Sequence, residues 1–305
     1  MTRKVPYDEF SMFHENAEEH GIPYHGPPAV RREQVALGDG RRLSALVWGT
    51  SQPEFVFLHG GAQNAHTWDT VLLALDRPAL AVDLPAHGHS DGSASGHLDV
   101  RGNARDVAKA IRELAPEAKT VVGMSLGGLT TIALSQQDPE LVRSVVLVDI
   151  TPGVNGDKSQ AITAFVNGPE SFPDFDAILA RTVEHNPTRS VASLRRGILH
   201  NAEQREDGTW VWRYARHRSM QPAPDDAVRF EGFKSLWDAL AELKVPLMLV
   251  RGMRQFSVVD DDDEAELLRR VPHARVEHVD AGHSVQGDQP VLLAHLIEDF
   301  SSRLL

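Results

Sequence analysis

The stretch VVGMSLGGLTTIALS at residues 121–135 restricts the fold of this chain more than any other feature. A short apolar run enters the turn Gly123-Met124-Ser125-Leu126-Gly127, and a helical pattern follows at once. G-x-S-x-G between a buried strand and a helix is typical of a nucleophile elbow, a sharp turn that presents a serine hydroxyl at a helix N-terminus. The two glycines avoid side chains that would clash in so tight a turn. A plain strand-to-helix connection is the alternative, and the flanking strand and helix patterns favour the elbow at Ser125.

Short apolar runs alternate with amphipathic stretches along most of the chain. The runs occupy residues 43–48, 54–59, 79–84, 119–124, 144–150, 246–252 and 274–280. Continuous apolar runs of this length are typical of strands buried on both faces. Strand, helix and strand in succession imply right-handed crossovers between parallel strands. We therefore predict the α/β class, with a doubly wound, mostly parallel sheet.

The alternation is interrupted in the second half of the chain. We predict an N-terminal extension at residues 1–32, an α/β core at 33–151 and 245–305, and a mainly helical insertion at 152–244. Open α/β sheets bind ligands at the carboxyl ends of their strands, so we expect the insertion to lie over that edge. Ordinary extra helices without a lid role are the alternative. Phe10 and Phe13 are expected to dock a short helix of the extension.

Composition excludes several classes of function. A formal net charge of −12 argues against nucleic acid or an anionic membrane surface as the main partner. The absence of Cys excludes thiolate nucleophiles and zinc–thiolate sites. We find no apolar run of about 18 residues and no secretory signal pattern, so we expect no membrane span and a cytoplasmic location.

A serine hydroxyl is a poor nucleophile unless a general base lies within hydrogen-bond reach. His283, in AGHSVQGDQP after the last predicted strand, is the one histidine in a suitable C-terminal loop. The order Ser125 first and His283 last is that of α/β-hydrolases. The other histidines are predicted to lie away from the strand ends or to have structural roles.

Acyl transfer also requires donors for a developing oxyanion. The segment FLHGGAQNAHTW places small residues directly after a strand, where the backbone can approach a substrate. The N–H of Gly61 or Ala62, together with that of Leu126, are the candidate oxyanion donors. His59 is expected to hold this loop by hydrogen bonds, and a simple glycine turn is the alternative.

Four segments together resemble the α/β-hydrolase fold family. They are FLHGGAQNAHTW, AVDLPAHGHSDG, VVGMSLGGLTTIALSQQDPELVRSVVLVDITPG and AGHSVQGDQP, and the resemblance extends from about residue 33 to 305 apart from the insertion. It implies that residues 152–244 form a cap over the active site. Two positions depart from the family pattern. Ala86 replaces a common Gly, and Gln255 stands where much of the family has the acid of its catalytic triad.

The resemblance leaves two candidates for that acid. Some members carry it at the end of the preceding strand, which here implies Asp149 in VVLVDITPG. There the carboxylate would hold His283 in the correct tautomer. The alternative is one member of the run Asp260 to Asp263, although carboxylates in the first turn of a helix more often cap free N–H groups. We favour Asp149.

Remaining patterns are weaker. Trp210, Trp212 and Trp237 are expected to line a substrate pocket, and ordinary core packing is the alternative. We predict no metal, because His87 and His89 fit a tight loop held by Asp83 and Ser90 better than a metal pair. We also predict no cofactor, since no nucleotide-binding glycine motif follows a strand.

These residues predict a cofactor-independent serine hydrolase that acts on a small-molecule ester, thioester or lactone through an acyl-enzyme on Ser125. Carbon–carbon bond hydrolysis, lyase chemistry and perhydrolysis can use the same triad. A non-enzymatic ligand receptor on the same fold is a further alternative. The natural substrate, the oligomeric state and the role of the N-terminal extension do not follow from the sequence.

Overall fold

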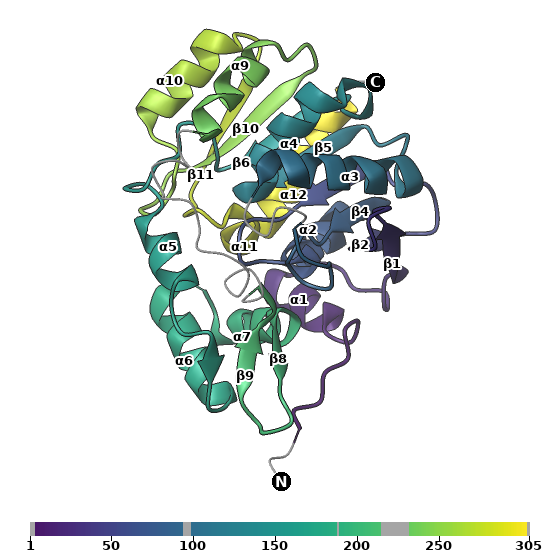
Figure 1. The fold of residues 1–305 in the computed structure, drawn as a ribbon, viewed down its shortest axis with the longest axis vertical. Helices are drawn as coiled ribbons and strands as arrows, with labels where there is room; N and C mark the ends of the chain where they lie inside the picture. The colour runs from purple at the N-terminus through teal and green to yellow at the C-terminus, as the bar shows by residue number, and fades with distance from the viewer. Residues whose placement is uncertain (1–3, 94–98, 188, 215–231, 304–305) are drawn as a thin grey trace.

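An eight-stranded mixed sheet forms the centre of the molecule (Figure 1). The computed structural model describes residues 4–93, 99–187, 189–214 and 232–303. The strand order is β1-β2-β4-β3-β5-β6-β10-β11. The pairs β1–β2 and β2–β4 are antiparallel, and all other neighbours are parallel. The mostly parallel α/β sheet predicted from the sequence is therefore confirmed.

Every predicted apolar run forms a strand, with ends that shift by one or two residues. The strands of the sheet are β1 (Val30–Ala36), β2 (Arg42–Trp48), β3 (Phe55–Leu58), β4 (Ala79–Val82), β5 (Thr120–Met124), β6 (Val145–Val148), β10 (Leu247–Gly252) and β11 (Arg275–Val279). The sequence did not predict β1, because its residues VRREQVA are polar and mostly accessible. An edge strand has a neighbour on one side only and needs no continuous apolar run.

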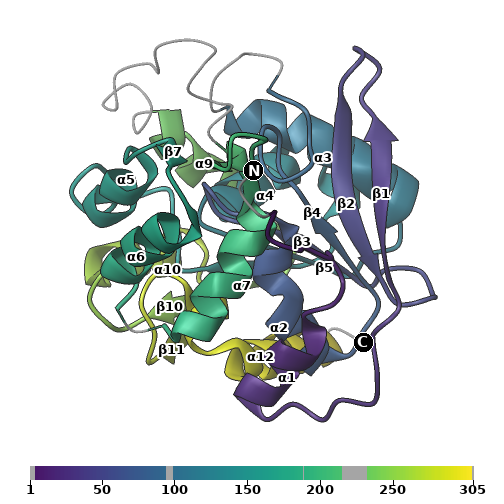
Figure 2. The same ribbon diagram turned by 90° about the horizontal axis from the view of Figure 1, so that it is seen from below.

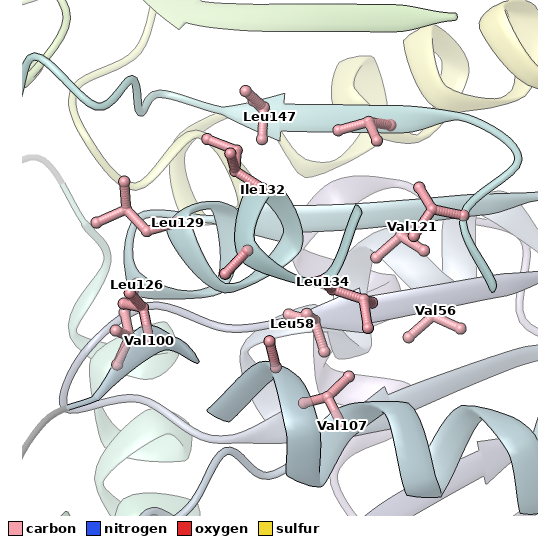
Figure 3. Close-up of a cluster of buried hydrophobic side chains, with 14 of the residues drawn as sticks. Val56, Leu58, Val100, Val107, Val121, Leu126, Leu129, Ile132, Leu134 and Leu147 are labelled. Atoms are coloured by element: carbon pink, nitrogen blue, oxygen red, sulfur yellow. The ribbon is translucent and has the colours of Figure 1, made fainter. Parts of the chain in front are cut away.

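Helices cover both faces of the sheet. One face carries α3 (Val100–Leu114), α4 (Leu126–Gln137), α9 (Leu236–Ala241) and α10 (Asp261–Arg270). The other carries α1 (Phe13–His20), α2 (Asp69–Leu75), α11 (Val285–Asp288) and α12 (Pro290–Ser302). Figure 3 shows Leu126, Leu129 and Ile132 of α4 in the first of these cores, together with Leu58 of β3, Leu147 of β6 and Val100 of α3. The apolar stripes of the helices are buried against the sheet, so its strand ends are held rigidly.

The segment between β6 and β10 forms a separate layer at one end of the sheet (Figures 1 and 2). It contains α5 (Gln160–Val166), α6 (Phe175–His185) and α7 (Val191–Asn201), as well as a small antiparallel sheet of β7 (Ser171–Phe172), β9 (Trp210–Trp212) and β8 (Ala202–Gln204). This small sheet was not predicted as a unit. The side chains of this small sheet form an aromatic cluster with neighbouring residues. Helix α9 also follows β6 in the chain, but it packs on α4 and does not belong to this layer.

The N-terminal extension is folded onto the rest of the chain. Its helix α1 buries Phe13, whose ring centroid lies 5.0 Å from that of Trp48 in β2. The same helix contacts α7, where Arg196 Nε donates to Asn16 Oδ1 at 2.8 Å. The predicted docked helix is therefore present, and it joins the core to the layer above the strand ends. Among the described helices, none has the length and apolar character needed to cross a membrane.

Candidate active site

Ser125 occupies a strained turn between β5 and α4. Its backbone has φ 51° and ψ −117°. A positive φ is unfavourable for any residue that carries a side chain, so the turn is strained. The turn is tight because α4 packs directly on β3. A Cβ at Gly127 would lie 2.1 Å from the carbonyl oxygen of Leu58, and one at Gly123 would lie 2.5 Å from the carbonyl oxygen of Gly127. Only glycine fits at these two positions, and the serine remains partly exposed.

The topology brings the ends of several strands together. Ser125 follows β5, Asp149 follows β6, and His283 lies in the loop after β11. The strands β5, β6, β10 and β11 are consecutive neighbours and run parallel. Their carboxyl ends therefore form one edge, which is where open α/β sheets place ligands.

His283 and Asp149 meet at this edge. The Nδ1 atom of His283 lies 2.8 Å from Oδ2 of Asp149, whose side chain is fully buried. The opposite ring nitrogen, Nε2, is buried and has no hydrogen-bond partner among the described residues. It therefore makes no hydrogen bond to Ser125 in this structure. Hydrogen bonds between a base and a nucleophile are often long without substrate and shorten when substrate binds.

The loop after β10 holds Asp149 in place. Its Oδ1 atom accepts hydrogen bonds from Gly252 N at 2.9 Å and Ser257 Oγ at 2.6 Å, and Oδ2 accepts one from Val258 N at 3.1 Å. This is the loop in which much of the family carries the acid itself. Here it supplies donors to an acid on the neighbouring strand, and Gln255 is exposed. Sequence reasoning missed Ser257, although a hydroxyl two residues after Gln255 was a usable signal.

The aspartate run lies at the start of α10. Asp260 and Asp263 form a capping box, in which Asp263 N donates to Asp260 Oδ1 at 3.0 Å. Lys158 contacts Asp263 at 2.7 Å, and Arg251 contacts Asp261 at 2.7 Å. No hydrogen bond or ion pair within the described part of the chain joins the run to His283. The structure thus brings Asp149 to His283 and leaves the run at a helix terminus.

The loop after β3 carries the predicted oxyanion donors. Ala62 has φ 62°, and its N–H already donates to Nε2 of His87 at 3.0 Å. That bond leaves the N–H of Gly61 as the better candidate in this loop. Leu126 is the first residue of α4, where the helix provides no acceptor for the backbone N–H.

His59 and the His87 loop have structural contacts. His59 Nδ1 donates to the carbonyl of Gly60 at 2.7 Å, and Nε2 accepts from Leu84 N at 2.9 Å. Burial lowers the pKa of His59 to about 4, so the ring is neutral at pH 7. Asp83 accepts from the N–H of His89 at 3.0 Å. These contacts tie the two loops together, as the sequence predicted.

The predicted pocket tryptophans separate into two places. Trp210 and Trp212 are buried in the aromatic cluster of the layer above the sheet, and Trp212 also lines a cavity of about 190 Å³. The same cavity is lined by Ala62 and Ser284, which are next to the candidate oxyanion donor and base. Trp237 lies in α9 in the core of the sheet, with the guanidinium of Arg270 at 5.6 Å from its ring centroid. The structure does not bring Trp237 to the other two.

Comparisons with known proteins agree with this architecture. The family model described as alpha/beta hydrolase fold matches residues 53–290. The esterase Rv0045c of Mycobacterium tuberculosis is 45% identical over 300 residues, which cover 95% of this chain and 94% of that protein. Its crystal structure superposes with a TM-score of 0.81 over 97% of this chain and 99% of that chain, at 44% identity. The structure of E-2-(acetamidomethylene)succinate hydrolase superposes with a TM-score of 0.76 over 90% and 100% of the two chains, at 26% identity.

Proposed function

The chain belongs to the α/β-hydrolase fold family and is an esterase, and we propose that it cleaves its ester through an acyl-enzyme on Ser125. The observation that carries this proposal is the buried His283–Asp149 pair. Nε2 of His283 has no hydrogen-bond partner in the described part of the chain, and it lies at the same sheet edge as the strained serine turn. A general base requires an imidazole that is held at one nitrogen and can accept a proton at the other.

Each group has a distinct role in the proposed mechanism. Ser125 Oγ attacks the ester carbonyl while His283 Nε2 accepts its proton, and the imidazolium then returns that proton to the departing alkoxide. Asp149 remains ionised, orients Nδ1–H and stabilises the imidazolium. The N–H groups of Gly61 and Leu126 donate to the oxyanion, and removing one such donor typically costs about 2.7–4 kcal/mol. Water, activated by the same histidine, then releases the acid.

We also propose that residues 152–244 act as the cap that selects the acyl group. The layer formed by α5, α6, α7 and the small sheet lies over the strand ends, and the cavity beside Ala62 and Ser284 reaches into it at Trp212. A cavity of this size suits an ester with a small or medium acyl chain, and thioesters or lactones share the same acyl chemistry. The cytoplasmic location stays a prediction.

Pre-steady-state hydrolysis of p-nitrophenyl esters, from acetate to dodecanoate, tests the acyl-enzyme. We expect a burst of about one nitrophenolate per enzyme, because acylation precedes slower release of the acid. Ser125→Ala abolishes the burst and lowers kcat by about 10⁴-fold or more. The matched control is Ser135→Ala on the same helix, whose hydroxyl only donates to the carbonyl of Ile132. A burst that survives in Ser125→Ala contradicts the proposal.

The dependence on chain length tests the cap. We expect kcat/KM to fall once the acyl chain exceeds the cavity, and Trp212→Ala to shift the preference toward longer chains. The same preference in both proteins would contradict a cap role for Trp212.

A further inference from the structure

A second histidine–carboxylate cluster lies outside the proposed triad, where three segments of the chain meet. His66 Nδ1 lies 2.9 Å from Asp69 Oδ2, and His200 Nε2 lies 3.8 Å from the same oxygen. His66 belongs to the short helix η1 (Ala65–Trp68), Asp69 begins α2, and His200 is in α7. All three side chains are at most 5% exposed. One nitrogen or oxygen atom from each lies within 4.8 Å of the others.

Two atoms of this cluster have no hydrogen-bond partner among the residues that the structure describes. His200 Nε2 and Asp69 Oδ1 are buried and make no hydrogen bond within the described part of the chain. Buried polar atoms in folded proteins nearly always have a partner, so each such exception requires an explanation. Both atoms belong to residues whose potential ligand atoms lie within 4.8 Å of one another. A ligand bound at that point would therefore give His200 and the Asp69 carboxylate a partner at the same time.

The outer ring nitrogens of both histidines are already held. His66 Nε2 lies 3.0 Å from Glu9 Oε1, and His200 Nδ1 lies 2.9 Å from the hydroxyl of Tyr7. A histidine that binds a metal almost always donates its other ring N–H to a carboxylate or another oxygen, which fixes the tautomer and the ring orientation. Glu9 and Tyr7 both belong to the N-terminal extension. By holding one nitrogen of each ring, they orient the other nitrogens, His66 Nδ1 and His200 Nε2, toward Asp69.

The charges around the cluster suit a divalent cation. Asp69 pairs with His66, and Glu9 and Asp83 pair with Arg32. The guanidiniums of Arg196 and Arg213, which also act on His200, are paired with Glu19 and Glu203. A metal ligand must lose its ring proton, and with both histidines neutral the carboxylates of Asp69, Glu9 and Asp83 and the guanidinium of Arg32 carry a net charge of −2. A divalent ion would balance that charge.

The cluster also borders open space. His66, Asp69 and His200 line the same cavity of about 190 Å³ as Trp212, together with polar side chains such as Asn64 and Thr67. A metal held by three protein ligands on one wall of a cavity keeps a position open for water.

We propose that His66 Nδ1, the Asp69 carboxylate and His200 Nε2 bind one divalent transition-metal ion. Two imidazoles and one carboxylate with an open position are a donor set that suits zinc. Tetrahedral ligands at about 2.1 Å from zinc are about 3.4 Å apart. The present distances of 2.9 and 3.8 Å lie on either side of that value. The two rings stack with centroids 3.8 Å apart and planes at 13°, so binding requires them to tilt away from each other.

The proposed ion would act as a brace. Its ligands come from the core and from α7, and the groups that hold those ligands come from the N-terminal extension. Occupation of the site would therefore fix three segments against one another. The candidate triad contributes no ligand to the proposed site.

Calorimetric titration of the full chain with ZnCl₂ tests the site. We expect one saturable site, with affinity lowered at least about 100-fold in His200→Gln because one of three protein ligands is lost. Tyr7→Phe keeps all ligands but removes the support of His200, so it should weaken zinc by about 10-fold. His185→Gln, a partly exposed cap histidine, and His283→Gln serve as matched controls and should bind zinc normally. Unchanged affinity in His200→Gln, or loss of binding in His283→Gln, overturns the proposal.

Two measurements on the wild-type protein avoid any folding defect of the variants. In crystals soaked with zinc, we expect an anomalous peak about 2.0–2.2 Å from the three donor atoms. Zinc should also raise the Tm of the wild-type protein, because it binds only the folded chain. Anomalous peaks only elsewhere, or no peak in soaked crystals, would overturn the site.

Discussion

Two buried histidine–aspartate pairs in this chain have nearly the same geometry and different surroundings. His283 Nδ1 lies 2.8 Å from Asp149, and His66 Nδ1 lies 2.9 Å from Asp69. Nε2 of His283 has no hydrogen-bond partner among the described residues, whereas Nε2 of His66 is held by Glu9. The distance between histidine and aspartate therefore does not determine the role of a pair. We infer that the role depends on what surrounds Nε2 of the histidine.

The aspartates differ as well. Asp149 accepts hydrogen bonds on both oxygens from the loop after β10, which fixes its carboxylate for one partner. Asp69 leaves Oδ1 without a partner among the described residues. A fully held carboxylate suits a residue that only orients an imidazole, and a partly open one suits a residue that can take a further ligand.

The largest expected effect comes from substituting the two aspartates in parallel. Asp149→Asn should lower kcat by about 10⁴-fold, because an amide stabilises the wrong tautomer of His283. Asp69→Asn should change kcat by less than about tenfold. Its free energy of unfolding should fall by about 1–3 kcal/mol, because a buried charged hydrogen bond is lost. Steady-state kinetics measures kcat of the two variants, and urea unfolding measures their free energy of unfolding. Similar losses of kcat in both variants would contradict the different roles assigned to the two pairs.

The two histidines should also respond differently to pH. Burial alone would lower the pKa of His66, but the charge and hydrogen bond of Asp69 and those of Glu9 outweigh it and raise the pKa to about 9 from 6.5. Arg32 and His200 also face this ring. A raised pKa contributes stability that is complete below pH 6.5 and disappears as pH rises through about 9, on the order of 3 kcal/mol.

Urea unfolding across this pH range measures that contribution. The decline in the free energy of unfolding should flatten in His66→Gln and persist in His283→Gln. In contrast, kcat/KM should rise with pH to a plateau, because a general base acts only without its proton. If the free energy of unfolding declines with pH in His66→Gln as it does in the wild type, the assignment of His66 is wrong. If kcat/KM does not change with pH, the assignment of His283 as the base is wrong.

A smaller effect is expected at the aspartate run. Asp260→Ala removes the side-chain acceptor at the start of α10 and should lower the free energy of unfolding by about 1 kcal/mol. The activity of the folded variant should not change. A loss of kcat comparable to that of Asp149→Asn would move the triad acid to the run.

The smallest effect is expected at the position where much of the family carries its acid. Gln255 is exposed, and Asp149 already occupies the partner site of His283. Gln255→Asp should therefore change kcat by less than about twofold, and it should not restore activity to Asp149→Asn. Recovery in the double variant would show that the loop can still supply the acid.

The sequence predicted the sheet well because its strands are buried on both faces and appear as continuous apolar runs. It did not predict β1, whose edge position needs no such run. Ser125 was recognisable because its turn demands glycines at fixed spacing. The pairing of His66 with His200 was not, since those residues are far apart in the chain and only the docking of α7 brings them together. The prediction of no metal site rested on the absence of Cys and on His87 and His89, which are close in sequence, and it did not consider histidines that lie far apart in the chain.

Intact-protein mass spectrometry after treatment with a fluorophosphonate tests the central claim most directly. We expect one adduct per wild-type chain, mapped to Ser125, with labelling slowed strongly in Asp149→Asn and unaffected in Asp262→Asn. An unlabelled folded wild-type protein, or an adduct that persists in Ser125→Ala, would contradict it.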